Sequence, residues 1–212
     1  MHHVDRGPEP EGLERVRKRS TPRWVAFYRN GEGTRPSDAH WRRFADTLGR
    51  AFQGLCAYCK RNCKGEVDHF RPKSRFPEIV YEWANWVFSC HDCNHAKGEK
   101  WPEGGYIAPC DPSDSARPER FFRFDTVTGE ILPASGLTPA ETHRARLMIR
   151  DLDLNGFHHL KSRLIWLAVL RGALDTVGPH SDERAKLMHL AGSRDTSFSS
   201  IARELFAQLE RL

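Results

Sequence analysis

Residues 56–97 read CAYCKRNCKGEVDHFRPKSRFPEIVYEWANWVFSCHDCNHAK, and this stretch decides how the middle of the chain folds. It begins with one CxxC pair, Cys56 and Cys59, and ends just after a second, Cys90 and Cys93. Each CxxC turn brings two thiolates to one side of a tight loop, and two such turns supply the four tetrahedral sulfur ligands that zinc prefers. The spacing therefore predicts a closed, structural zinc site.

The remaining cysteines and the nearby histidines leave alternatives open. One CxxC pair could instead be a redox pair of the thioredoxin kind, but no βαβ pattern surrounds either pair. Cys63 lies close enough to Cys59 to compete as a ligand, and Cys110 sits in a loop and resembles a small buried side chain. We expect neither Cys63 nor Cys110 to bind zinc. His91 and His95 could be alternative ligands or phosphate contacts, but solvated surface residues are the favoured interpretation.

Outside this stretch the composition is that of an ordinary soluble protein. The 212 residues can bury a core without disulfides, and no apolar run is long enough to span a membrane or act as a secretory signal. The cytoplasm is therefore the expected compartment, where six cysteines favour metal ligands over disulfides. The formal net charge is +5, and residues 1–80 hold 17 Lys and Arg against 10 Asp and Glu, so the positive excess lies there.

The motifs of the central segment follow one another in a specific order. They are a CxxC pair, a DHxxPxS segment beginning at Asp68, an Asn at position 85 before an apolar pair, and a CxxCNxxK segment ending at Lys97. In this order they resemble the HNH (His-Me finger) endonucleases over about residues 55–101. The phage Holliday-junction resolvase of that superfamily interleaves zinc knuckles and an Asp-His pair in a similar way. The resemblance implies a ββα-metal fold for this unit and hydrolysis of phosphodiester bonds as its activity.

The resemblance also implies roles for particular residues. Carried over by position, it makes His69 the general base and makes Asp68 and Asn94 the ligands of one catalytic divalent cation. It gives Asn85 the task of holding the loop and the ring of His69. A carboxylate and an amide carbonyl offer only oxygen, which suits Mg²⁺ or Mn²⁺ better than zinc or nickel. A neutral imidazole can deprotonate water near pH 7, and the cation can neutralise charge on the phosphate and the leaving oxygen.

A basic strip lies beside this predicted centre. Residues 60–75 hold six Lys and Arg against two acidic side chains, which suits phosphate contacts, although a solvated polar loop is the simpler alternative. We expect nucleic acid to contact Arg71, Lys73, Arg75 and Lys97, and DNA is favoured over RNA. Two other functions remain open: a stand-alone restriction-type or mobile-element HNH nuclease, and a catalytically dead zinc-ribbon module that binds nucleic acid.

The flanking sequence predicts mostly helices. We expect an extended arm to residue 20, a short helix from Thr21-Pro22, and a second helix capped by Ser37. FFRFDTVTGEIL predicts a hairpin, and Thr138 with Glu141 forms a capping box that begins a helix running to about residue 150. Apolar periodicity predicts two further helices, over residues 160–174 and 198–212.

These elements define the expected fold class and domain organisation. The class is α+β and mostly helical, with a central ββα-metal unit that carries the zinc knuckles. The expected parts are an N-terminal arm with helices over 1–54, the HNH unit over 55–105, a loop and hairpin over 106–137, and a C-terminal helical region over 138–212.

The whole layout resembles a narrower group, the PtuB-type HNH subunits of Septu and certain retron anti-phage defence systems. The shared features outside the centre are short: Pro109-Cys110, the hairpin, and a helix followed by Leu154-Asn155. The resemblance implies that the nuclease is an effector in such a defence system. It also implies an ABC-type ATPase partner of the PtuA kind, with the helical tails as docking surfaces. Core packing alone would explain the same amphipathic helices.

Overall fold

The computed structural model describes residues 1–37, 39–179 and 181–211. Its helices and strands are α1 (Leu13–Val25), α2 (Ala39–Arg42), α3 (Ala45–Ala51), β1 (Glu66–His69), β2 (Trp86–Ser89), α4 (His91–Lys97), α5 (Pro118–Phe121), β3 (Phe122–Phe124), β4 (Ile131–Pro133), α6 (Pro139–Asp151), α7 (Phe157–Thr176), α8 (Asp182–Gly192) and α9 (Ser199–Leu209). A π-helical turn, Ala26–Asn30, continues α1, and short 3₁₀ turns lie at Pro77–Ile79, Trp83–Asn85 and Asp114–Ala116.

The centre of the molecule is a ββα unit. β1 pairs with β2 in antiparallel register, with Asp68 opposite Val87 and His69 opposite Trp86. α4 begins two residues after β2 ends, so the second CxxC pair lies at the start of this helix. Strand β2 is buried along its whole length because structure covers both faces of this small sheet. The expected fold class, α+β and mostly helical with a central ββα unit, is confirmed.

The N-terminal helix begins earlier than expected. We expected an extended arm to residue 20, but α1 starts at Leu13 and contains Pro22 in its interior. Leu13, Val16, Ser20 and Trp24 recur every three or four residues and are all buried, so one face of this helix packs on the core. The gain from burying that face explains why the helix extends on both sides of Pro22.

The second expected helix is broken in two. The Ser37 hydroxyl accepts a hydrogen bond from the amide of Ala39 at 3.2 Å, as a capping residue does, but α2 ends at Arg42 and α3 begins at Ala45. Trp41 in α2 and Phe44 just before α3 are both buried. Both helices contact β1, so this segment covers one side of the ββα unit.

The C-terminal half largely follows the sequence patterns. β3 and β4 form the expected hairpin, and both hydrogen bonds of the Thr138 and Glu141 capping box are present at the start of α6. α7 and α9 match the two periodic segments, although Leu212, expected within the last helix, lies outside the described residues. α8 was not predicted, because its apolar residues are mostly exposed or half-buried and leave a weak periodic signal.

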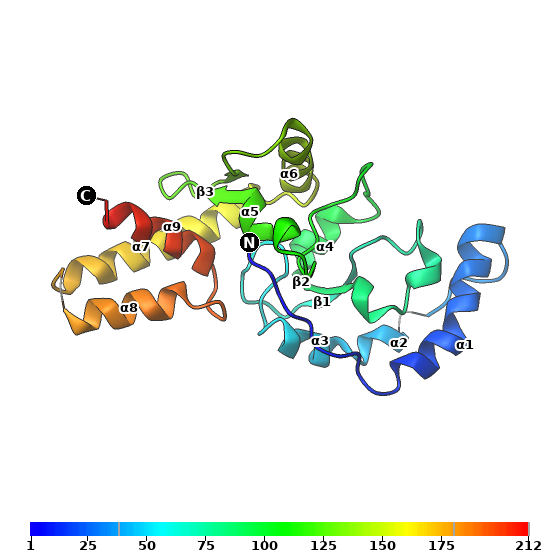
Figure 1. Cartoon of the computed structure of the whole chain (residues 1–212). Coiled ribbons are helices and arrows are strands. Elements are labelled where there is room, and N and C mark those ends of the chain that lie inside the picture. The colour runs from blue at the N-terminus through cyan, green and yellow to red at the C-terminus, as the bar shows by residue number, and fades with distance from the viewer. Residues whose placement is uncertain (38, 180, 212) are drawn as a thin grey trace.

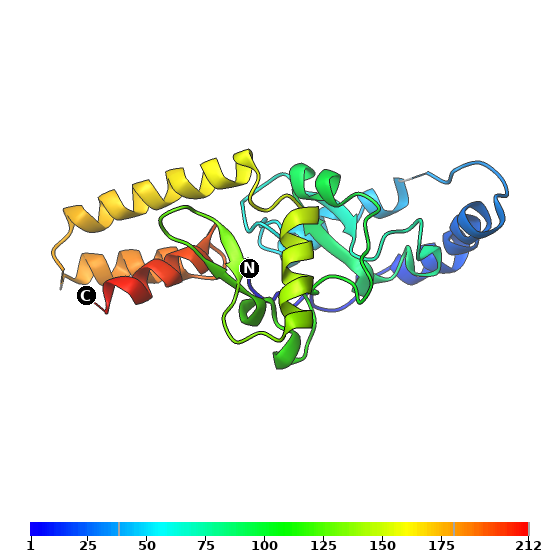
Figure 2. The same ribbon diagram turned by 90° about the horizontal axis from the view of Figure 1, so that it is seen from above.

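The parts lie in a row. α7, α8 and α9 lie together at one end of the molecule, α1 lies at the other end, and β1, β2 and α4 lie between them, as Figure 1 and Figure 2 both show. The β3–β4 hairpin and α6 lie between the helical end and the central unit. Within the described residues, every helix is too short or too polar to cross a membrane.

Candidate active site and metal cluster

The two CxxC pairs meet in one buried cluster. The sulfur atoms of Cys56, Cys59, Cys90 and Cys93 all lie within 4.8 Å of one another, and those of Cys59 and Cys90 are 3.8 Å apart. Four sulfurs placed tetrahedrally at the Zn–S distance of about 2.3 Å are separated by about 3.8 Å. The donor set and its spacing therefore fit a structural zinc ion.

The four thiols hydrogen-bond one another, and their pKa values move apart: the pKa is lowered at Cys56 and Cys90 and raised at Cys59 and Cys93. Burial raises the pKa of the Cys56 thiol, but hydrogen bonds from the other three thiols outweigh burial and hold that pKa well below its usual value. Cys63 and Cys110 lie outside the cluster and are half-buried. His91 and His95 also lie outside it, on the exposed face of α4, where their rings stack 5.7 Å apart.

A histidine that the sequence did not indicate contacts the cluster. His159, from the first turn of α7, is buried and places Nε2 3.5 Å from the Cys93 sulfur. Burial lowers the pKa of His159, so its ring is neutral and Nε2 can donate to a thiolate. Arg163, one turn further on, is fully buried and donates to the carbonyl oxygens of Gly129 and Leu154. The C-terminal region is thus packed directly against the four-cysteine cluster.

A second site is lined by residues of β1 and α4. A cavity of about 410 Å³ is lined by Asp68 and His69 from β1, Asn94 from α4, Trp41 from α2 and Lys73 from the loop after β1. Successive residues of a strand point to opposite faces, so Asp68 is turned toward α4 and His69 toward α2. The structure therefore brings together three of the four residues predicted to be catalytic.

The ring of His69 is held in one tautomer. Nε2 lies 2.9 Å from the carbonyl oxygen of Val80, and the indole of Trp86 donates to the same oxygen at 2.8 Å. A carbonyl oxygen can only accept, so Nε2 carries the proton and Nδ1 keeps its lone pair. Burial lowers the pKa of His69 to about 3, and the charges of Lys73 and Lys97 act in the same direction against the Val80 hydrogen bond. The imidazole is therefore neutral at pH 7.

Asn85 holds the loop between the strands. Its Oδ1 accepts from the amide of Arg71 at 2.8 Å, and its Nδ2 donates to the carbonyl of Arg71 at 3.1 Å. The expectation that Asn85 also holds the His69 ring was wrong, because the backbone carbonyl of Val80 does so. A backbone carbonyl has no sequence signature, so no pattern could have indicated it.

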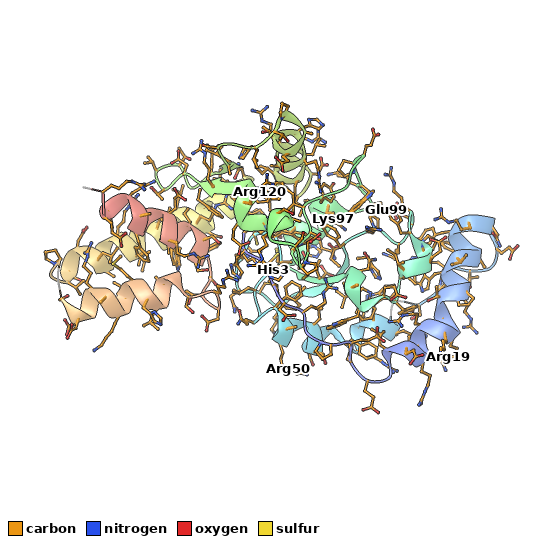
Figure 3. The ribbon with its side chains drawn as sticks, in the orientation of Figure 1. His3, Arg19, Arg50, Lys97, Glu99 and Arg120 are labelled. Atoms are coloured by element: carbon orange, nitrogen blue, oxygen red, sulfur yellow. The ribbon has the colours of Figure 1, made fainter. Side chains whose placement is uncertain are left out.

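Lys97 lies in the interior of the protein and not at the surface. We expected a phosphate contact, but its side chain is fully buried in the middle of the molecule (Figure 3). Its Nζ donates to Asp68 Oδ1 and to the carbonyl oxygen of His69, both at 2.8 Å. Lys97 lies four residues after Cys93, about one helical turn, so both side chains lie on the same face of α4, toward the sheet. The expectation of a surface contact at Lys97 was therefore wrong.

Of the other three predicted phosphate contacts, one lines the cavity and two do not. Lys73 lines the cavity and places its ammonium 5.7 Å from the centre of the Trp41 ring. Arg71 extends over Phe76, and Arg75 donates to the carbonyl oxygen of Trp101 at 2.6 Å. Neither of these arginines lines the cavity, whereas Arg42, which we did not predict, does.

Comparison with known proteins places this segment in a class. Residues 56–100 match the family model described as HNH endonuclease, so this part of the chain is an HNH endonuclease domain. A segment of 48 residues is 40% identical to the Septu protein PtuB of Bacillus thuringiensis. That alignment covers 20% of this chain and 19% of PtuB, so the chain matches about a fifth of the length of this curated relative.

Proposed function

We propose that this chain is a metal-dependent endonuclease that hydrolyses phosphodiester bonds, with DNA as its substrate. The observation that carries the proposal is the cavity in which a neutral His69, with an unprotonated Nδ1, lies beside an oxygen donor set from Asp68 and Asn94. The HNH match over residues 56–100 supports the same activity. In this proposal residues 55–105 carry the chemistry, and the four-cysteine cluster holds a structural zinc.

The donor set fits a hard divalent cation. Each oxygen of the Asp68 carboxylate accepts one hydrogen bond, from Tyr58 or Lys97, and a carboxylate oxygen has a further lone pair. The Asn94 side chain is half-buried, lines the cavity, and makes no side-chain hydrogen bond to another described residue. Asp68 and Asn94 would hold Mg²⁺ or Mn²⁺, which prefer oxygen ligands. When bound, the cation supplies charge neutralisation for the phosphate and the departing oxygen.

His69 performs the proton transfer. Nδ1 accepts a proton from the attacking water, while the Nε2 hydrogen bond to the Val80 carbonyl keeps the ring in position and stabilises the imidazolium that forms. The edge of the His69 ring lies against Trp41, with centroids 4.8 Å apart, which limits rotation of the imidazole. Lys73 lines the same cavity, and its ammonium would contact a non-bridging phosphate oxygen.

The test is cleavage by the purified protein. Supercoiled plasmid, single-stranded DNA and RNA are incubated in Mg²⁺, in Mn²⁺ and in metal-free buffer, with the zinc content measured in parallel. We expect DNA cleavage in Mg²⁺ or Mn²⁺ and none without them, because the base alone does not neutralise the departing oxygen. Cleavage of RNA alone would overturn the choice of substrate. Binding without cleavage, both with and without the ATPase partner, would instead identify a catalytically dead module.

We further propose that the chain acts in a defence complex with an ABC-type ATPase. The similarity to the Septu protein PtuB supports this role. One face of α7 supports a docking surface, since Ile165 and Val169 are 53% and 67% exposed and Leu164 lies beside them. Adjacent exposed apolar residues on one helix face are unusual unless they meet a partner. In the proposed complex the ATPase covers this face.

Charge introduced on that face should break the complex. We expect the double variant Ile165→Glu, Val169→Glu to weaken co-purification with the neighbouring ABC-type ATPase about 10- to 100-fold, because two carboxylates would be desolvated at the interface. Lys186→Glu, an exposed position on α8, is the matched control for added negative charge. Affinity is measured on the co-expressed complex. If the double variant and Lys186→Glu both co-purify with the ATPase as well as the wild type does, the interface lies elsewhere.

A further inference from the structure

Both hydrogen-bond partners of the Asp68 carboxylate belong to the zinc-ligand segments. Tyr58 lies between Cys56 and Cys59, and Lys97 is on α4 one turn after Cys93. Both side chains are fully buried. The first CxxC segment and the second therefore each contribute one contact to the same carboxylate.

The geometry fixes the rotation of this carboxylate. The hydroxyl of Tyr58 donates to Oδ2 at 2.5 Å, and Nζ of Lys97 donates to Oδ1 at 2.8 Å. Nζ also donates to the carbonyl oxygen of His69 at 2.8 Å, so Lys97 contacts both residues of the Asp-His pair. With one donor on each oxygen, the plane of the carboxylate is set from two sides.

We propose that Tyr58 and Lys97 are positioning residues, through which the zinc cluster sets the orientation of Asp68 and thereby the affinity of the active site for its divalent cation. The inference rests on the proposed nuclease function and assigns roles that the HNH motif does not. Partners that orient a metal-binding carboxylate typically change metal affinity about 10- to 100-fold when removed. The ammonium of Lys97 also compensates the buried negative charge of Asp68, which a neutral side chain could not do.

Tyr58→Phe is the sharpest test because it removes only the hydroxyl. We expect Mn²⁺ binding by the zinc-loaded protein to weaken about 10- to 100-fold, measured without nucleic acid by the electron paramagnetic resonance of free Mn²⁺. In cleavage assays the Mn²⁺ concentration for half-maximal rate should rise by a similar factor, while kcat at saturating Mn²⁺ changes less. Zinc content should stay at the wild-type value, since the hydroxyl does not contact sulfur.

Tyr106→Phe is the matched control. Tyr106 is also buried, and its hydroxyl donates to Asp151 Oδ2 at 2.9 Å, away from the cavity. The Tyr106→Phe variant should lose about as much stability as Tyr58→Phe, and it should bind Mn²⁺ with the affinity of the wild type. Wild-type Mn²⁺ affinity in Tyr58→Phe would overturn the inference while leaving the nuclease proposal standing. A wild-type protein that neither binds Mn²⁺ nor cleaves would overturn the nuclease function itself.

Lys97→Met tests the second contact. The variant keeps the aliphatic stem of the side chain and removes the ammonium, so we expect weaker Mn²⁺ binding with the zinc retained. Tighter Mn²⁺ binding would mean that Lys97 acts by charge repulsion and would overturn its positioning role. Loss of zinc would assign Lys97 to the cluster and overturn the role in the same way. If this variant fails to fold, Tyr58→Phe still decides the proposal.

Discussion

The His69→Ala variant is expected to lose about 10²- to 10⁴-fold in kcat for phosphodiester cleavage, the usual contribution of a positioned general base. Nδ1 is the only nitrogen of this ring with a lone pair available, because Nε2 donates to the Val80 carbonyl. Alanine removes the proton acceptor from the cavity and leaves Asp68 and Asn94 in place. Mn²⁺ affinity should therefore change little while the rate falls.

A matched control separates chemistry from folding. His69 is buried against Trp41 and Trp86, so the alanine variant will also lose some stability, which thermal unfolding measures. His91→Ala removes an exposed imidazole from the same domain and should retain the full rate. Cleavage by a folded, zinc-containing His69→Ala protein at the wild-type rate would rule out the assignment of the base.

Removal of one zinc-ligand thiol should have the largest effect on folding. We expect Cys93→Ser to lose the zinc and the native fold of the central unit. Structural zinc sites in small domains contribute about 10–16 kcal/mol, against about 5–15 kcal/mol for the total stability of a typical protein. The loss should extend to the C-terminal region, because His159 of α7 packs on Cys93. Zinc content by mass spectrometry and tertiary structure by near-ultraviolet circular dichroism measure both effects.

The remaining cysteines provide the controls. Cys63→Ser and Cys110→Ser change thiols outside the cluster and should keep one zinc per chain and the wild-type spectrum. Zinc lost from Cys63→Ser, or a wild-type protein purified without zinc, would refute the assignment of the four buried cysteines as the zinc ligands.

Motifs with a specific spacing predicted several parts of this protein. The CxxC spacing predicted the cluster, and the capping box predicted the start of α6, where Thr138 and Glu141 bond each other. The DHxxPxS and CxxCNxxK segments indicated Asp68, His69 and Asn94, which do line one cavity. The start of α1 differs from the prediction because burial of Leu13 and Val16 extends the helix to the N-terminal side of Pro22.

The sequence by itself determined which side chains form the cysteine cluster and which ones line the cavity as predicted, and only the tertiary structure decided how each is held. In the sequence Lys97 is one more basic residue in a basic region. In the structure its position on α4 directs the side chain inward, where it donates a hydrogen bond to Asp68. The tautomer of His69 depends on the carbonyl of Val80, which any residue could supply. His159 reaches Cys93 from 66 residues away. Contacts of this kind depend on packing between distant segments and on backbone atoms, and neither leaves a pattern in the order of the amino acids.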